Sequence, residues 1–282
     1  MSRGAAGLLL LVGLAGILLP FAWMLAVSFL PESALFAPGV APLGGAASEG
    51  AGFTLQHFTL EHYRALFSER NFWLPIRNSF VVAGATTLCS LVLGATCAYA
   101  LARMHFRGKG FLLGFILAIA MFPQMSIVSP LFLMLRWLGL IDTYSGLVLP
   151  YVTFAMPLAI WLLVGFFRQL PPDLEEAARV DGAGRLRTLV EVILPITAPA
   201  VATTAILTFV YCWNEFLFAL YFTLGPERQT VPVAIALFRG QYQVPWGQVL
   251  AAASVSVAPV AAFVLVFQRR IVQGLTSGAV KG

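Results

Sequence analysis

Charged side chains are scarce in this sequence of 282 residues, because aspartate, glutamate, lysine and arginine together make up only 10% of it. A soluble domain carries about 25% charged residues, since its surface must face water. This chain cannot cover such a surface, so a soluble fold is excluded. A hydrophobic fraction of 60% also excludes disorder, because disordered chains are poor in apolar residues. Lipid must therefore be the solvent for much of the exterior.

The sequence also lacks any run or stripe of basic residues. Its net charge is +5 and its pI is about 9.4, but the arginines and lysines are scattered, whereas nucleic-acid-binding proteins gather them on one face. Membrane proteins gain such a charge from their cytoplasmic loops, so we expect no nucleic-acid partner. The three cysteines lie in apolar stretches without metal-ligand spacing, and are predicted to be packing residues: Cys89, Cys97 and Cys212.

Motifs for catalysis are missing too. No G-x-x-x-x-G-K-[ST] phosphate-binding loop is present, and the segment Gly108-Lys109-Gly110 lacks the flanking glycine spacing. His57, His62 and His105 lie in or beside loops without a paired cysteine, serine or carboxylate motif, and we expect them at the surface. The chain is therefore predicted not to be an enzyme, and to hold neither a metal nor a cofactor of its own.

What the sequence does contain is long apolar runs. A helix that crosses the hydrocarbon needs about 20 apolar residues, and six stretches qualify: 5–29, 76–103, 111–137, 146–168, 196–223 and 249–268. The first is too long for a signal-peptide core and is closed by no convincing cleavage site, so it is interpreted as an uncleaved first span. The predicted fold is an all-α integral membrane protein, with one transmembrane domain over 1–282 and a five-helix core over about 76–268.

The distribution of lysine and arginine predicts the orientation of these spans. Loops on the side of the two termini carry eleven of these residues, and loops on the opposite side carry six. Cytoplasmic loops are the ones enriched in positive charge. We therefore expect a multi-pass protein of the cell (cytoplasmic) membrane with both termini in the cytoplasm, an internal loop over 169–195, a cytoplasmic tail over 269–282, and external segments over 30–75 and 224–248.

The internal loop has a helix–turn–helix pattern between Pro171 and Pro195. Asp173 is a candidate N-cap, and Glu176 follows it three residues later, as in a capping box. Gly182 and Gly184 can adopt turn conformations that are closed to other residues. The apolar residues that follow recur with helical spacing and predict an amphipathic second helix: Leu186, Leu189, Val190 and Ile193. Pro195 is then expected to open the fifth span.

The same loop resembles a known signature. Glu176-Ala177-Ala178, Gly182 and Val192-Ile193-Leu194-Pro195 follow the "EAA" pattern of ABC-importer permeases, E-A-A-x3-G-x9-I-x-L-P, with Val192 in place of isoleucine. Three further segments look like the carbohydrate-type permeases, of which the smaller permease of maltose and trehalose transporters is the familiar example: Leu140-Ile-Asp-Thr-Tyr, Tyr211-Cys-Trp-Asn-Glu-Phe and the ending Gln268-Arg-Arg through Gly282. The resemblance covers nearly the whole chain.

This resemblance implies a function and a set of partners. The chain would be the permease subunit of a binding-protein-dependent ABC importer that moves a carbohydrate, such as the disaccharides maltose or trehalose, into the cytoplasm. An ABC ATPase dimer would bind ATP and Mg²⁺, a second homologous permease would share the pore, and an extracytoplasmic sugar-binding protein would deliver the substrate. The implied ATPase-coupling residues are Glu176, Ala177, Ala178, Asp181, Gly182, Leu194 and Pro195, and the implied binding-protein-facing residues are Arg239, Gly240, Gln241 and Tyr242.

Asn214 and Glu215 place polar groups in the fifth apolar stretch. A charge inside the membrane is costly and usually faces a pore or a partner. One interpretation puts both residues near the translocation path, where they would bind a sugar or stabilise a kinked helix. The other is a structural polar pair that forms a hydrogen bond between helices, and we favour this second interpretation.

Two alternative functions remain open from the sequence. A permease of the same architecture could carry another solute, such as glycerol phosphate or a polyamine. A secondary transporter driven by an ion gradient belongs to a different class, and commonly shows inverted repeats and several ionisable groups within its spans. Because only Glu215 stands out here, that class is disfavoured. Dependence of uptake on ATP distinguishes the two classes.

Overall fold

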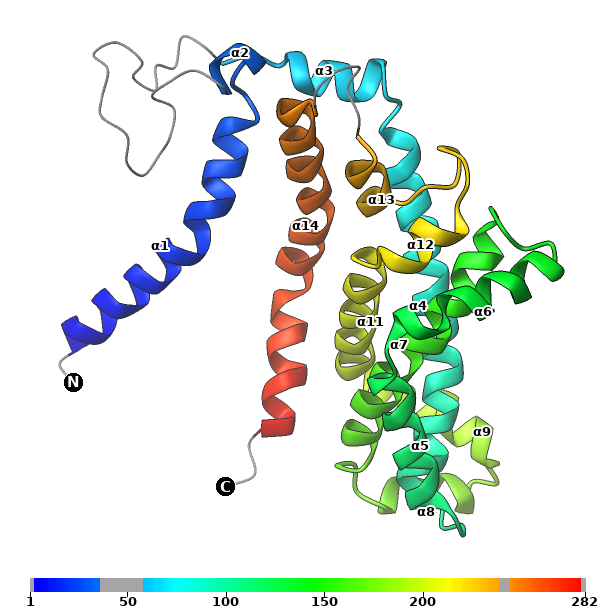
Figure 1. Ribbon diagram of the computed structural model, residues 1–282. Helices are drawn as coiled ribbons and strands as arrows, with labels where there is room; N and C mark the ends of the chain where they lie inside the picture. Colours follow the sequence, from blue (N-terminus) through cyan, green and yellow to red (C-terminus); the bar gives the residue numbers. More distant parts are fainter. Residues whose placement is uncertain (1–2, 36–57, 239–243, 280–282) are drawn as a thin grey trace. The chain divides into compact units, whose positions relative to one another are not determined.

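The computed structural model describes residues 3–35, 58–238 and 244–279, and within these ranges every regular element is a helix (Figure 1). This confirms the predicted all-α fold. The helices are, in chain order, α1 (Arg3–Val27), α2 (Glu32–Leu35), α3 (Glu61–Ser68), α4 (Trp73–Arg103), α5 (Lys109–Met121), α6 (Gln124–Trp137), α7 (Tyr144–Phe167), α8 (Asp173–Val180), α9 (Arg185–Thr188), a π-helix (Leu189–Ile193), α10 (Leu194–Ile196), α11 (Ala198–Trp213), α12 (Leu217–Phe222), α13 (Val231–Ala236) and α14 (Trp246–Ala279).

Four helices in the described part of the chain are each long and apolar enough to cross a membrane, namely α1, α4, α7 and α14. Two bent pairs bring the number of candidate spans to six. In the first pair α5 and α6 meet at 91°, and in the second the segment Arg185–Ile196 meets α11 at 85°. The six apolar stretches of the sequence therefore all fall on helices, but 111–137 is divided between α5 and α6, and 196–223 begins at the last residue of α10 and continues over α11 and α12.

Proline causes the break between α5 and α6. Pro123 is the N-cap of α6, and Phe122 before it has extended backbone angles, φ −71° and ψ 131°. A residue that precedes proline is pushed out of the helical region by the ring, and proline has no N–H with which to continue the helix. The exposed residues around the break include Phe122 and Met125.

The chain forms two compact units, and the first contains residues 1–73 and 234–259. Within this unit α3 and the chain directly after it are bonded to two distant segments. His62 Nε2 lies 2.8 Å from the carbonyl oxygen of Leu30, and Arg70 Nε donates to Gln248 Oε1 at 2.6 Å. His62 is only 5% exposed and its ring lies against Gly247, so the expectation that it is a surface residue is wrong.

The second unit contains residues 74–233 and 260–282 and is built around α4 and α7. Gly94 of α4 lies so close to α7 that an added Cβ would be 3.4 Å from the Cβ of Ala159. Small residues allow such approach between membrane helices, whose association depends on close packing. Near the inner-loop ends of these helices lies a core that Leu189 and Ile193 join from the loop: Ala95, Ala98, Tyr99, Leu101, Ile116, Ile160, Leu163, Val164 and Phe167.

Candidate functional site

Helix α8 forms the first half of the loop that carries the signature. Its first turn contains Asp173, Glu175 and Glu176, and acidic residues at this end are stabilised by the partial positive charge of the helix N-terminus. The predicted capping box is wrong, because Asp173 is the first helical residue and Pro172 is the N-cap, without a side-chain cap bond. The acids therefore favour the helix through its dipole rather than through a cap.

A glycine turn ends α8, as the sequence predicted. Gly182 has φ +81°, a left-handed conformation that glycine adopts without steric cost. The N–H of Gly182 donates to the carbonyl of Arg179 at 3.1 Å, and the N–H of Ala183 donates to that of Ala178 at 2.9 Å. These two bonds form a Schellman motif, which closes the helix and reverses the chain. Gly184, by contrast, has ordinary extended angles, φ −73° and ψ 165°.

The second half of the loop departs from the predicted amphipathic helix. A π-helix occupies Leu189–Ile193 between the short helices α9 and α10, so the 3.6-residue period is not maintained. Leu189 and Ile193 are buried in the core, whereas Leu186 is 67% and Val190 is 54% exposed. Pro195 does not open the fifth span, because it lies inside α10 and the bend into α11 follows it, at Thr197.

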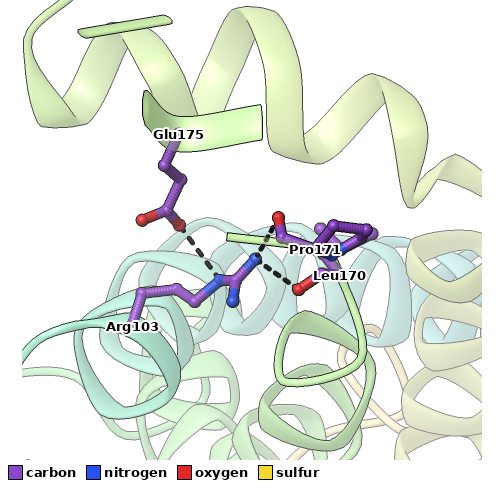
Figure 2. Close-up of polar contacts among 4 residues, drawn as sticks. All are labelled: Arg103, Leu170, Pro171 and Glu175. Carbon is purple, nitrogen blue, oxygen red and sulfur yellow. Dashed lines mark hydrogen bonds and ion pairs between the residues drawn. The ribbon is translucent and has the colours of Figure 1, made fainter. Parts of the chain in front are cut away.

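An ion pair holds α8 against the end of α4 (Figure 2). Arg103 Nε lies 3.0 Å from Glu175 Oε1, and the two side chains are only 12% and 16% exposed. The same guanidinium donates through Nη2 to the carbonyl oxygens of Leu170 at 2.8 Å and Pro171 at 3.2 Å. Arg103 therefore fixes both α8 and the chain that leads into it. We call Arg103 and Glu175 the loop anchor.

The opposite side of α8 is exposed. Glu176 and Ala177 lie at the surface, and Val180 is 88% exposed, while Ala178 faces inward and is 6% exposed. Val180 lies one helical turn after Glu176, so an acid and an apolar side chain share this exposed side of the helix. We call Glu176, Ala177 and Val180 the outer face of α8.

The remaining signature residues occupy both surface and core positions. Asp181 is exposed and is the C-cap of α8, directly before the exposed Gly182. Leu194 packs on the core of the second unit, and Pro195 is exposed. The signature thus combines residues that shape the loop with residues that remain available to a partner.

The structure separates the two polar residues at the end of α11. Glu215 is 9% exposed, and its Oε1 and Oε2 accept from the backbone N–H groups of Phe218 at 2.8 Å and Ala219 at 3.3 Å. Its carboxylate therefore caps the N-terminus of α12, at the break between α11 and α12. Asn214 is exposed, and its Nδ2 donates to the carbonyl of Val210 at 2.8 Å. These bonds give Glu215 a structural role, but they form locally at the break between α11 and α12 and not between two packed helices as expected.

Glu215→Ala should lower the thermal stability of the protein, because the N–H groups of Phe218 and Ala219 would lose their buried acceptors. A buried donor left without an acceptor costs about 1–3 kcal/mol. The melting temperature in detergent measures this effect, and Glu215→Gln should be milder because its amide oxygen can accept one bond. Asn214→Ala is the matched exposed control, with a small shift expected. An unchanged melting temperature for Glu215→Ala would exclude the capping role.

A polar contact outside the predicted site joins the first broken span to α11. Gln124 at the start of α6 donates through Nε2 to the hydroxyl of Tyr211 at 3.1 Å. Tyr211 is 39% exposed, and the exposed Asn214 lies one turn further along the chain. The sequence singled out Tyr211 and Asn214 but gave no signal for Gln124, which becomes relevant only because Pro123 breaks the span beside it.

The predicted binding-protein-facing residues cannot be placed. Arg239, Gly240, Gln241 and Tyr242 lie outside the described residues, and so does most of the segment between α2 and α3. The described parts of the external loop are 224–238 and 244–248; they include α13, and Thr230 directly before it is buried. These four residues therefore stay a prediction.

Comparison with known proteins identifies the family. The family described as binding-protein-dependent transport system inner membrane component matches residues 90–277. The trehalose/maltose transport system permease protein MalG of Thermococcus litoralis is 41% identical over 268 residues, covering 94% of this chain and 92% of that protein. The trehalose transport system permease protein SugB of Mycobacterium tuberculosis is 45% identical over 275 residues, covering 97% and 95%.

A solved structure shows the same fold. The crystal structure of a bacterial ABC transporter involved in the import of the acidic polysaccharide alginate matches with a TM-score of 0.74 at 23% sequence identity, covering 95% of this chain and 98% of that one. The family match extends over the loop anchor, the outer face of α8 and the broken fifth span. The chain belongs to the family of binding-protein-dependent transport system inner membrane components.

Proposed function

We propose that this chain is a permease subunit of an ATP-driven importer that moves a carbohydrate, a disaccharide of the maltose or trehalose kind, into the cytoplasm. Two relatives that are more than 40% identical over most of the chain carry trehalose or maltose in their names. The family description supplies the dependence on a binding protein. The single observation in the structure that carries the proposal is an exposed, anchored helix α8 inside the family's signature loop.

Energy would reach this chain from outside it. The sequence has no phosphate-binding loop, so the proposal assigns ATP and Mg²⁺ to a partner ATPase dimer and no ATPase site to this chain. The outer face of α8 would dock on that dimer, because it offers an acid and the exposed Val180 on a helix whose other side is fixed by Arg103. Because the ATPase is cytoplasmic, the proposal puts the loop over 169–195 and both termini on the cytoplasmic side of the membrane. The excess of lysine and arginine in the loops assigned to that side supports this orientation.

The packing of the loop suggests how a displacement of α8 would reach the spans. Leu189 and Ile193 are buried with residues of α4, α5 and α7 in one core, and close-packed interiors transmit displacement rather than absorb it. The bend of 85° before α11 gives a place where the chain can change direction. ATP-driven closure of the partner would thus favour one of two arrangements of the spans, which is alternating access.

Two further partners complete the proposed importer. A second, homologous permease would share the pore, and a sugar-binding protein would dock on the outer side, where the loop over 224–248 is expected. Within this chain, the polar residues Gln124, Tyr211 and Asn214 are the candidates for the translocation path, because backbone and amide groups at a break in a span require water or protein around them.

Gly182→Val should reduce recovery of the intact complex. A left-handed conformation costs an L-residue about 1–2 kcal/mol, and a β-branched side chain tolerates it worst. The fraction of molecules whose loop has the docking conformation should therefore fall about tenfold. Co-purification of the ATPase with the tagged permease measures the effect. Gly184→Val is the matched control: an added Cβ meets no atom within 4 Å at either glycine, and only Gly182 has a positive φ. Equal recovery of the two variants would contradict the turn argument.

The central experiment is uptake by proteoliposomes that contain this chain, its partner permease and the ATPase, with the binding protein added outside. Labelled trehalose and maltose should accumulate only when ATP is available to the ATPase. Uptake that runs on an ion gradient without ATP would overturn the proposal. A thermal-shift screen of the binding protein against disaccharides, glycerol phosphate and polyamines identifies the solute; a shift with either of the last two alone would overturn the carbohydrate assignment while leaving the ATP-driven importer intact.

A further inference from the structure

A half-enclosed pocket of about 590 Å³ lies behind α8, between the end of α4 and the start of α9. Pockets of about 300–1,000 Å³ hold small molecules in other proteins. The lining is mostly polar, and its ionisable residues come from the end of α4 with the residues after it, from α8 and from α9: Tyr99, Arg103, His105, Glu175, Arg179 and Arg185. The outer face of α8 takes no part in it, so the pocket is separate from the proposed ATPase-docking surface.

Positive charge in this pocket exceeds negative charge. Arg103 pairs with Glu175, the only carboxylate among the lining residues. Arg179 and Arg185 form no ion pair within the described part of the chain, and Nη1 of Arg185 lies 4.0 Å from the sulfur of Met104. Two guanidinium groups without a carboxylate therefore border one half-enclosed space.

Guanidinium groups select a particular class of ligand. Their planar N–H groups match the oxygens of a phosphate and bind them through paired, charge-assisted hydrogen bonds. The position suits a phosphate as well, because the candidate span α4 ends at Arg103, and the head groups of phospholipids lie beyond the ends of the hydrocarbon-spanning segments. Basic pockets between spans on the cytoplasmic side bind anionic head groups in other membrane proteins.

We propose that this pocket binds a phosphate group, supplied by an anionic phospholipid or by a soluble phosphate. Arg179 lies before the turn at Gly182 and Arg185 lies after it. One anion bound to both would bridge the two helices of the loop across that turn. Bound phosphate would thereby stiffen the segment that the ATPase moves, so this pocket makes the loop responsive to the lipid or phosphate around it.

The test is a binding titration of the whole purified complex, delipidated in detergent, with no ATP and no sugar present. The probes are dihexanoyl phosphatidylglycerol, inorganic phosphate and, as a zwitterionic control, dihexanoyl phosphatidylcholine, followed by calorimetry. Arg185→Gln should weaken binding of the anionic probe by about tenfold, the effect of one lost charge-assisted bond. Arg187→Gln is the matched control: it removes the same charge two residues away, from a side chain that pairs with Glu191 outside the pocket.

Each outcome decides the proposal. Binding of phosphatidylglycerol that is lost with Arg185→Gln and kept with Arg187→Gln supports a lipid ligand, and the same pattern with inorganic phosphate supports a soluble one. No binding of either anion, or equal loss in both variants, overturns the proposal. Loss of the ATPase from the Arg185→Gln complex with anion binding unchanged also overturns it, because the pocket would then serve the protein partner. Uptake is not measured, so a failure of the proposed transport function cannot be confused with these results.

Discussion

Glu176→Lys should reduce ATP-driven uptake of the sugar at least tenfold while the protein remains inserted in the membrane. The side chain lies on the outer face of α8 and takes part in no ion pair within the described residues, so reversing its charge removes only its small stabilising interaction with the helix N-terminus. At the proposed interface, a reversed charge would face the groups that attract an acid, and such a juxtaposition costs several kcal/mol. When both are measured on the same proteoliposomes, uptake should fall while ATP hydrolysis continues.

Two variants make this result interpretable. Glu176→Gln keeps the shape of the side chain and removes only its charge, so it should fall between the wild type and Glu176→Lys. Glu191→Lys reverses a charge in the second half of the same loop, where the acid is 57% exposed and its one ion pair among the described residues is with Arg187. Such an exposed ion pair contributes little to the stability of the protein, so uptake by Glu191→Lys should change little. Normal uptake by Glu176→Lys would contradict the proposal that α8 couples transport to ATP hydrolysis.

Local sequence chemistry predicted the elements that depend on neighbouring residues. Acids before Ala177 and Ala178, followed by Gly182, predicted a short helix closed by a left-handed glycine, and the structure contains both. The predicted N-cap at Asp173 was wrong because the helix begins one residue earlier than expected, at Asp173 itself. Pro172 precedes it, and its fixed φ suits the start of a helix. Residue type alone could not distinguish an N-cap from the first helical position.

Periodicity was a weaker guide to the second half of the loop. The spacing of Leu186, Leu189, Val190 and Ile193 fits a regular α-helix, but a π-helix closes its ring over five residues and rotates the side chains that follow. Only Leu189 and Ile193 reach the core. The exposed Leu186 and Val190 leave an apolar surface that lipid or a partner subunit would have to cover, and no single-chain pattern could assign it.

The translocation path shows the same limit. An acid in an apolar stretch predicted either a pore residue or a structural bond, and the two backbone N–H groups held by Glu215 could be found only from the break between α11 and α12. Gln124 and Tyr211 are far apart in the sequence and meet through the bend at Pro123. Contacts made by breaks in helices depend on tertiary geometry, and they escape an analysis that counts apolar residues.

Reversing the charge of either member of the loop anchor should disable the loop, and reversing both should restore part of the function. Arg103→Glu and Glu175→Arg would each place two like charges together in a site that is less than 20% exposed. Removing one partner of a buried pair already costs about 3–5 kcal/mol, and the water that reaches this pair places it near the lower limit. Uptake and co-purification of the ATPase should fall more than tenfold in both single variants.

The double variant tests the pair itself, because a direct interaction makes the loss in the double variant smaller than the sum of the two single losses. Recovery should be incomplete: Arg103 also donates to the carbonyl oxygens of Leu170 and Pro171, and a glutamate at position 103 cannot donate to them. Arg103→Glu alone should for the same reason be the more damaging single change. If the double variant is no better than Arg103→Glu, the carbonyl bonds rather than the ion pair hold α8 in place, and the coupling segment is fixed by the chain that enters it.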